Sequence, residues 1–205
     1  MSQLSVQAVV GGGQVDDAAA IERSLVESEL FAVIFDRHAP YIHRYLARRL
    51  GWEIADDLVG ETFLVAFRRR RTYDLGRADA RPWLYGIATN LVSQHRRDEV
   101  RRLRLQRVDL ASDVLPAHDD RVAARVVAQS MRAPLTAALA GLSSDDRDVL
   151  LLIAWEQLSY DEVAAALSIP VGTVRSRLNR ARRKVRTVLG DGDPAMTFQE
   201  VLDNG

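Results

Sequence analysis

Apolar residues recur every three or four positions through most of the chain, which is the spacing of helices with one buried side. In the first half this pattern predicts three helices, over residues 28–50, 53–71 and 82–104. Pro40 interrupts the first pattern and is expected to kink or split that helix, whereas Pro82 suits the first turn of the third. No segment alternates apolar and polar residues for long enough to predict a strand. The chain is therefore predicted to be all-α.

The second half is predicted to hold shorter helices with clear start signals. Ser144 is expected to cap one helix, and Ser159 with Glu162 three residues later forms a capping-box pattern that opens another. A turn that contains Pro170 then leads into a final basic helix. A short helix, a tight turn and a basic helix in this order predict a helix-turn-helix. The predicted helices of this half cover residues 119–142, 145–157, 160–167 and 170–189.

These patterns predict two small helical domains joined by a flexible linker, the C-terminal one a helix-turn-helix. The linker is placed where the sequence is acidic, contains Pro116 and lacks apolar periodicity. The predicted parts are a flexible N-terminal tail 1–27, a helical domain 28–107, the linker 108–118, the helix-turn-helix domain 119–190 and an acidic C-terminal tail 191–205.

Composition excludes several classes of protein. The 205 residues include no cysteine, so disulfides, thiolate zinc sites and cysteine nucleophiles are excluded. No stretch approaches the roughly 20 apolar residues of a membrane helix, and the first 20 residues lack the pattern of a signal peptide. A cytoplasmic protein without direct membrane insertion is therefore expected.

The 28 basic and 28 acidic side chains cancel in number but are segregated along the chain. Residues 68–104 carry eleven arginines against four acidic residues, and residues 170–190 carry six arginines and one lysine with no acidic residue. Two separate basic segments are typical of a protein that contacts a polyanion at two places. Each segment alone could equally be the solvated face of a helix.

The final helix is predicted to bury one side and expose a basic one. Its buried seam is predicted to contain Val174, Leu178, Ala181, Val185 and Val188. The opposite side carries Arg175, Ser176, Asn179, Arg180 and Arg183. Helix-turn-helix domains place the start of this helix in the major groove, where arginine bonds guanine edges and asparagine bonds adenine. A basic amphipathic helix on the surface of a helical bundle is the structural alternative.

A second group of polar residues lies on the third predicted helix. Asn90, Gln94, Arg97 and Arg101 form a stripe beside the apolar side, and Trp83 lies near the helix start. Amides, cations and an aromatic ring together suit single-stranded or distorted DNA, because unstacked bases need flat partners and the backbone needs positive charge. Trp83 taken alone is more typical of a core residue.

Four motifs that occur in order along the chain resemble one known family. They are DLVGETFL at 57–64, WLYGIATN at 83–90, LSYDEVA at 158–164 and GTVRSRL at 172–178. Together they resemble bacterial RNA polymerase sigma factors of the extracytoplasmic function (ECF) group in the sigma-70 family. The resemblance covers residues 28–189, which is nearly all of the chain outside the two tails.

The resemblance implies three binding surfaces and a function in promoter-specific transcription initiation. For docking on the β′ clamp helices of core polymerase, the matching residues are Asp57, Glu61 and Phe63. For recognising and melting the −10 element, they are the loop 72–81 with Trp83, Asn90, Gln94, Arg97 and Arg101. For reading the −35 element, they are Thr173, Arg175, Ser176, Arg177, Asn179, Arg180, Arg183 and Lys184.

The family also implies the other partners: promoter DNA, the β flap of polymerase and an anti-sigma factor. It implies no catalytic activity, cofactor or metal of the chain's own. One departure is Gly60, where many members of the family have glutamine, so one polar contact to polymerase is in doubt.

Two other functions remain as alternatives. The first is a conventional helix-turn-helix repressor or activator, which would have no use for the motifs of the first domain. The second is a nucleic-acid hydrolase that holds Mg²⁺ on Asp56, Asp57 and Glu61. Adjacent aspartates on a helix diverge by roughly 100°, which disfavours a shared metal.

Overall fold

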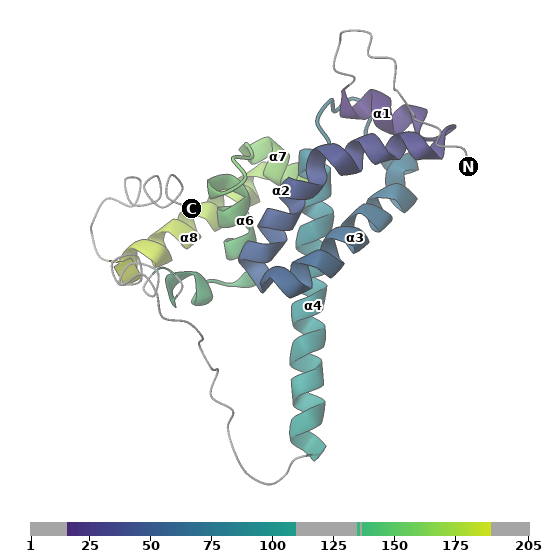
Figure 1. Ribbon diagram of the computed structural model, residues 1–205. Helices are drawn as coiled ribbons and strands as arrows, with labels where there is room; N and C mark the ends of the chain where they lie inside the picture. Colours follow the sequence, from purple (N-terminus) through teal and green to yellow (C-terminus); the bar gives the residue numbers. More distant parts are fainter. Residues whose placement is uncertain (1–15, 110–134, 136, 190–205) are drawn as a thin grey trace, which may run out of the picture.

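The computed structural model describes residues 16–109, 135 and 137–189, and every regular element in these ranges is helical (Figure 1). The all-α prediction is thereby confirmed. Within the same ranges, no helix is both long and apolar enough to cross a membrane.

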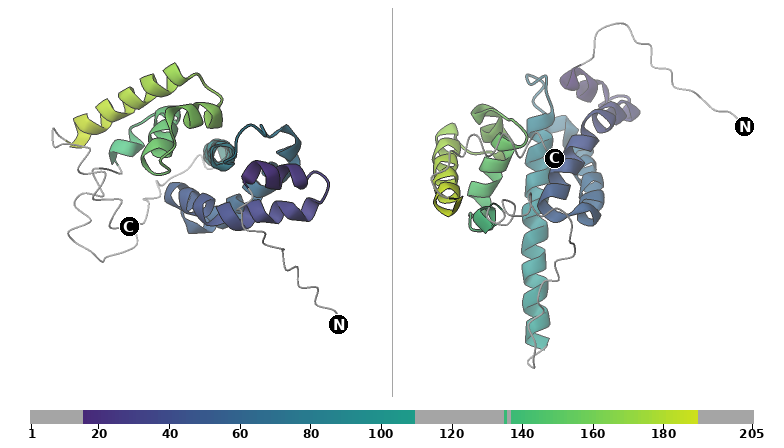
Figure 2. Two further views of the ribbon diagram at one scale, coloured as in Figure 1. Left: turned by 90° about the horizontal axis from the view of Figure 1, so that it is seen from above. Right: turned by 60° about the vertical axis from the view of Figure 1, so that its left-hand side comes forward.

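The helices follow one another in two groups (Figure 2). The first group contains α1 (Asp17–Arg23), α2 (Ala32–Leu50), α3 (Trp52–Arg69) and α4 (Arg81–Asp109), with short 3-10 helices at Ser28–Phe31 and Arg70–Thr72. The second group contains α6 (Ser144–Ala154), α7 (Tyr160–Leu167) and α8 (Val171–Leu189).

In the first group, α2 and α3 pack side by side against the upper half of α4, whose lower half projects beyond the bundle (Figure 1). Gly51 reverses the chain between α2 and α3 with φ of +89°, a conformation that glycine adopts at little cost. The predicted split at Pro40 does not occur, because α2 runs through it as one helix. Pro40 is exposed, so water can bond the carbonyl that lacks its helical partner.

Several predicted boundaries are corrected. Part of the predicted N-terminal tail is helix α1, which begins with the Asp16 side chain accepting a hydrogen bond from the Ala19 amide at 2.8 Å and which buries Ile21 completely. Helix α4 extends to Asp109, into the predicted linker, whereas residues 110–118 of that linker lie outside the described residues. The first 16 residues of the predicted helix 119–142 also lie outside them.

The second group agrees closely with the local signals. The capping box of Ser159 and Glu162 is present at the start of α7, with both reciprocal hydrogen bonds formed. The cap of α6 lies one residue earlier than predicted, since Ser143 rather than Ser144 accepts the hydrogen bond from the Asp146 amide. The buried seam of α8 ends at Val185, because Val188 is 53% exposed.

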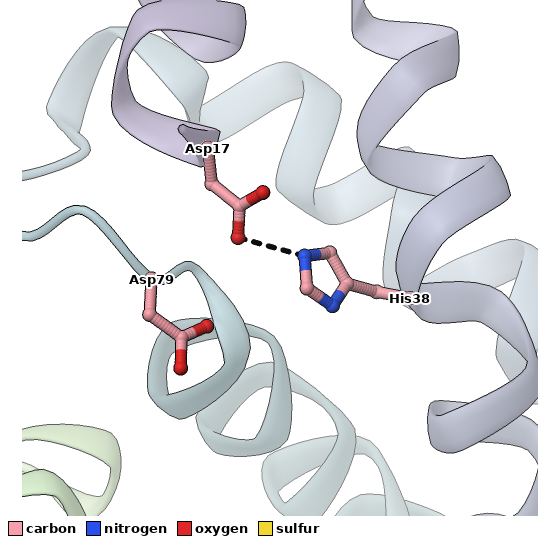
Figure 3. A group of neighbouring side chains, drawn as sticks. All are labelled: Asp17, His38 and Asp79. Carbon is pink, nitrogen blue, oxygen red and sulfur yellow. Dashed lines mark hydrogen bonds and ion pairs between the residues drawn. The ribbon is translucent and has the colours of Figure 1, made fainter. Parts of the chain in front are cut away.

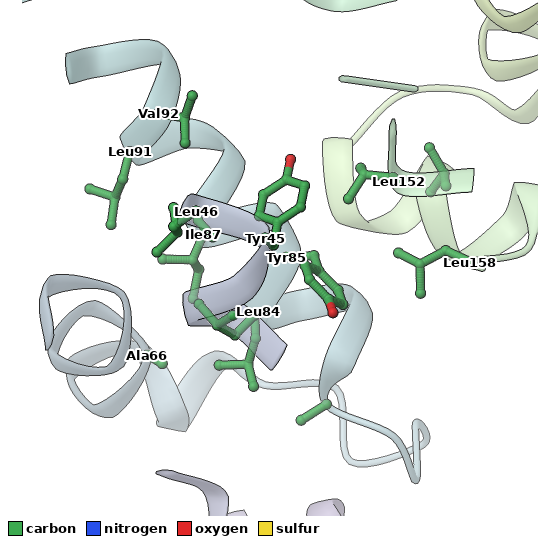
Figure 4. Close-up of a cluster of buried hydrophobic side chains, with 14 of the residues drawn as sticks. Tyr45, Leu46, Ala66, Leu84, Tyr85, Ile87, Leu91, Val92, Leu152 and Leu158 are labelled. Atoms are coloured by element: carbon green, nitrogen blue, oxygen red, sulfur yellow. The ribbon is translucent and has the colours of Figure 1, made fainter. Parts of the chain in front are cut away.

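The two domains pack against each other through a continuous apolar core (Figure 4). Tyr45 and Tyr85 of the first domain lie beside Leu152 and Leu158 of the second, and the two tyrosine rings meet edge to face at 5.3 Å. Helix α7 also lies directly on α4 at Gly86, where a Cβ atom would sit 2.3 Å from the carbonyl oxygen of Ala166. Only glycine permits this approach.

Buried polar contacts cross the same interface. The Arg49 guanidinium of α2 donates to Asp148 of α6 at 2.5 Å, and it also donates to the Tyr45 hydroxyl at 2.6 Å. The Tyr85 hydroxyl of α4 donates to the Glu156 carboxylate. Removing one partner of a buried charged pair is costly, so these contacts fix how the domains sit on each other.

We predict that Gly86→Gln separates the domains. The new side chain cannot fit against Ala166, whereas glutamine favours the helix over glycine and keeps α4 intact. The same change at Gly60, an α3 glycine with nothing within 4 Å of its Cβ position, is the matched control. Small-angle X-ray scattering should show a larger radius of gyration for Gly86→Gln only. Equal values for both variants and the wild type would refute the interpretation of Gly86.

Candidate nucleic-acid interface

The polar stripe of α4 is exposed along one face. Asn90, Gln94, Arg97 and Arg101 all point to solvent, and the opposite side buries Leu84 and other apolar residues. Their spacing of four, three and four residues aligns them over three helical turns. Among the described residues, these four side chains make a single loose ion pair, from Arg101 to Asp98 at 3.9 Å. The stripe therefore presents two amides followed by two cations.

The two aromatic residues at the start of α4 are held by neighbours. The Trp83 ring is partly buried and lies 5.0 Å from the ring of Tyr73, whose hydroxyl donates to the Arg77 carbonyl at 2.5 Å. Tyr85 is fully buried and bonded to Glu156. Trp83 thus supports the loop that precedes α4 and offers only part of its ring to a ligand, while Tyr85 offers none.

That loop is anchored on Asp17, a residue that the sequence analysis had placed in a flexible tail. One Asp17 carboxylate oxygen accepts from the Ala80 amide at 2.8 Å and is bonded to His38 Nε2 at 2.7 Å (Figure 3). The other oxygen accepts from Arg37, and the Asp17 amide donates to the Ala78 carbonyl at 3.0 Å. Helix α1 therefore ties the loop to α2.

Burial by itself raises the pKa of the Asp17 carboxyl, but its bonds to His38, the Ala80 amide and Arg37 outweigh burial and lower the pKa to about 2. The only sequence signal for this anchor was the Asp16-Asp17 pair before three alanines, which is a helix-start pattern.

Asp17, His38 and Asp79 form the one group in the described parts of the chain whose ligand atoms lie close enough to hold a metal, within 4.8 Å of one another. Both oxygens of Asp17 already accept hydrogen bonds, one of them from a guanidinium. A cation would have to displace these donors, so the geometry fits a structural anchor better than a metal site.

On α8, the predicted −35 residues divide into two sets. Arg175, Ser176, Asn179, Arg183 and Lys184 are exposed, and Thr173 is partly exposed. The other two are held by α6: Arg177 pairs with Asp145 at 2.7 Å, and Arg180 pairs with Asp146 at 3.1 Å. Asp146 is buried, so Arg180 satisfies a carboxylate that would otherwise lack a charged partner. Arg180 stays exposed and Arg177 partly exposed despite these ion pairs, so their predicted contact with the −35 element stays a prediction.

The predicted docking residues on α3 also divide. Asp57 and Glu61 are exposed one helical turn apart, and Leu64 continues the same stripe at 47% exposure. Phe63 is only 5% exposed, with its ring packed edge to face on Phe35 at 4.9 Å. Phe63 therefore shapes this surface from beneath and does not form part of it.

The hydrolase alternative finds no support in this surface. Asp56 is bonded to His43 at 2.8 Å and points away from the stripe of Asp57 and Glu61. Among the described residues, these three carboxylates do not form a group that could hold a metal.

Comparison with family models assigns both domains. The model for sigma-70 region 2 matches residues 34–102, and the model for sigma-70 region 4 matches residues 132–185.

Curated relatives agree with these matches. The RNA polymerase sigma factor CarQ of Myxococcus xanthus is 34% identical over 80% of this chain and 91% of its own length. The ECF sigma factor SigL of Mycobacterium tuberculosis is 32% identical over 86% of this chain and 95% of its own. The ECF sigma factor SigE of Mycolicibacterium smegmatis is 35% identical over 75% of this chain, which spans only 59% of that relative.

Two solved structures share the fold. The sigma factor RpoE of Bartonella quintana, in complex with the anti-sigma factor NepR, has a TM-score of 0.57 at 22% identity, covering 78% of this chain and 96% of its own. CnrH, in complex with the cytosolic domain of CnrY, has a TM-score of 0.59 at 24% identity, covering 84% and 96%.

We predict that Asp17 contributes stability that is lost in acid. Its carboxyl has a folded-state pKa below the unfolded value near 4, so its contribution is complete above pH 4 and disappears as pH falls towards 2. Asp17→Asn should therefore lower the free energy of unfolding by about 2 kcal/mol at pH 6, and the difference from the wild type should shrink between pH 4 and pH 2.

Urea unfolding at several pH values measures this difference. Glu22→Gln, at an exposed carboxylate of the same helix, is the control and should show no such trend. A constant difference between the wild type and Asp17→Asn at all pH values would contradict the role of the Asp17 charge.

Proposed function

The chain belongs to the ECF group of the sigma-70 family, whose members serve promoter-specific transcription initiation by RNA polymerase, and from this premise we propose how its residues divide that work. One observation carries the proposal: two exposed polar and basic surfaces, on α4 and α8, belong to two separate domains. The chemistry of RNA synthesis is left to polymerase, and the chain supplies binding and remodelling in the cytoplasm.

The α8 surface reads the −35 element. Arg175, Ser176 and Asn179 lie near the start of the helix, where a helix-turn-helix meets base edges in the major groove. Arg183 and Lys184, two turns farther along, contact phosphates. Arg177 and Arg180 hold α8 on α6 and thereby set the angle at which the reading residues enter the groove.

The α4 surface and the loop before it act on the −10 element. Asn90 and Gln94 offer amide donors and acceptors to the edges of bases that leave the stack, and Arg97 and Arg101 hold the backbone. Unstacking costs a few kcal/mol per step, which capture of the freed base and contacts to the strand must offset. The Asp17 anchor fixes the loop, so the loop loses less conformational entropy when a base is captured.

The α3 stripe of Asp57, Glu61 and Leu64 docks on the β′ clamp helices of core polymerase, and the second domain contacts the β flap. An apolar residue flanked by exposed carboxylates offers both buried area and charge complementarity to a basic helical partner. An anti-sigma factor is a further partner, since the sigma factor RpoE, which shares this fold, forms a complex with the anti-sigma factor NepR.

The packed arrangement of the two domains must open on a promoter. Helix α8 packs on α7, which packs on α4, so the two DNA-reading helices are separated by about 20 Å at neighbouring interaxial spacings of 8–10 Å. The −35 and −10 elements lie about 25 base pairs apart, or about 85 Å along the duplex. Polymerase binding therefore has to supply the free energy that separates the domains, and it then presents both surfaces at a fixed distance.

The whole proposal is tested by reconstitution. We expect the purified chain to co-elute with core polymerase freed of sigma factors and to direct transcripts from genomic DNA of the source organism that start downstream of a shared pair of motifs. Mapping the transcript 5′ ends measures this. Failure to bind core polymerase, together with tight binding to duplex operator DNA alone, would favour the repressor alternative.

The division of labour on α8 gives a sharper prediction. Arg183→Ala should leave the melting temperature unchanged, weaken binding to a −35 duplex and reduce the slope of log K against log salt by about 1. Arg180→Ala should instead destabilise the second domain by about 1–2 kcal/mol, because buried Asp146 loses its partner. Thermal unfolding and duplex titrations in several salt concentrations measure both effects. If Arg180→Ala keeps full stability but changes the preferred bases, Arg180 reads DNA directly.

A further inference from the structure

A cavity of about 390 Å³ lies on the seam between the two domains. One wall comes from α2, with Tyr41 and Arg44, and from Arg81 at the start of α4. The other wall is the turn between α6 and α7, with Trp155 and Glu156. The volume falls in the range of sites for small organic ligands, and such sites occur preferentially between domains.

The cationic groups of this cavity retain capacity for an anion. Arg44 makes no ion pair within the described residues, and its guanidinium lies over the Tyr41 ring at 5.3 Å. The Arg81 guanidinium donates a hydrogen bond to the Glu156 carbonyl at 2.8 Å and also interacts with the Tyr85 hydroxyl. A guanidinium has five N–H donors in a fork that matches phosphate oxygens. Both arginines can therefore donate hydrogen bonds to a phosphate without losing their present contacts.

Glu156 adds an acceptor that the protein itself does not satisfy. One carboxylate oxygen accepts from Tyr85, but Oε1 is buried and has no hydrogen-bond partner. Burial raises the pKa of this carboxyl above its usual value and outweighs the hydrogen bond of Tyr85 and the nearby charges of Arg44 and Arg48, which lower it. A buried acceptor without a partner costs free energy, which a ligand N–H group could recover.

Aromatic surface completes the site. Tyr41 is 46% exposed, and Trp155 is partly exposed with Arg48 lying over its ring at 5.4 Å. Tyrosine and tryptophan rings stack on flat heterocycles and tolerate any base. The cavity thus offers hydrogen-bond donors for phosphate oxygens, an aromatic wall for a base and one acceptor for an N–H group of that base. These three kinds of group together can bind a nucleotide.

We propose that this cavity binds a nucleotide whose base carries an amino group, with its phosphates on Arg44 and Arg81, its base against Tyr41 and Trp155, and an N–H group of the base bonded to Glu156 Oε1. The amino groups of adenine, guanine and cytosine are donors of the required kind. Because the walls belong to both domains, the site is complete only while the domains are packed.

The proposal has a regulatory consequence that rests on the proposed function. A ligand that binds only the packed arrangement stabilises it against the separated one. Since the separated arrangement is the one that reads a promoter, the nucleotide acts as an inhibitor of DNA binding in the absence of polymerase.

Isothermal titration calorimetry on the full chain tests binding directly, with ATP, GTP and inorganic pyrophosphate as probes and without polymerase or DNA. We expect saturable binding of ATP or GTP that Arg44→Ala weakens at least tenfold. Arg69→Ala, at an exposed arginine of α3 that does not line the cavity, should stay within twofold of the wild type. Gly86→Gln should abolish binding without altering any cavity residue, because it separates the walls.

Three results would overturn the proposal: no saturable binding up to millimolar nucleotide, equal binding by the wild type and Arg44→Ala, or pyrophosphate binding as tightly as the nucleotides. The last result would leave the base without a role. Since this assay contains no polymerase, its failure leaves the sigma-factor function standing, and failure of the transcription assay leaves a measured nucleotide affinity intact.

Discussion

Helix α4 is the constraint on which the rest of the structure depends, because three different surfaces share its circumference. Leu84 and Leu91 face the bundle of α2 and α3 (Figure 4). Gly86 faces α7 at backbone contact. Only the remaining stripe, with Asn90 and Gln94, is exposed to solvent. The residues that we propose act on the −10 element are therefore positioned by packing on both of their flanks, and they do not depend on a loop for their direction.

The second domain packs on the first through α7 and α4, whereas the proposed function requires it to bind the −35 element away from the first domain. In the packed arrangement, Arg49 is bonded to Asp148 and Tyr85 to Glu156 away from water. Separation hydrates these groups, so the cost of opening is smaller than the cost of deleting one partner while the interface stays closed. The interface is thus specific in geometry, and the proposed opening on a promoter leaves none of these groups without a hydrogen-bond partner.

The sequence predicted those features that neighbouring residues determine. The helix-turn-helix follows from a capping box, a turn and an apolar seam, all within 30 residues, and it was found almost to the residue. The features that the sequence did not predict depend on partners far away along the chain. Asp17 is meaningful only beside His38 and the Ala80 amide, and Arg180 only beside Asp146, 34 residues earlier. A basic residue on an exposed helix face gives no sign of such a partner, so the sequence did not predict the ion pair of Arg180 with Asp146.

Helix α6 explains how the second domain can leave the first without losing the shape of its DNA-reading surface. Its first turns carry Asp145 and Asp146, which hold Arg177 and Arg180 of α8, while Asp148 holds Arg49 of the other domain. These pairs lie on different sides of the interface, so opening breaks the contact of Asp148 and keeps the other two. In the proposed −35 complex, the arginines of α8 that stay bonded to α6 fix the angle at which Ser176 and Asn179 approach the major groove. Three acidic residues in one short helix thereby separate the task of holding the domains together from the task of aiming the recognition helix.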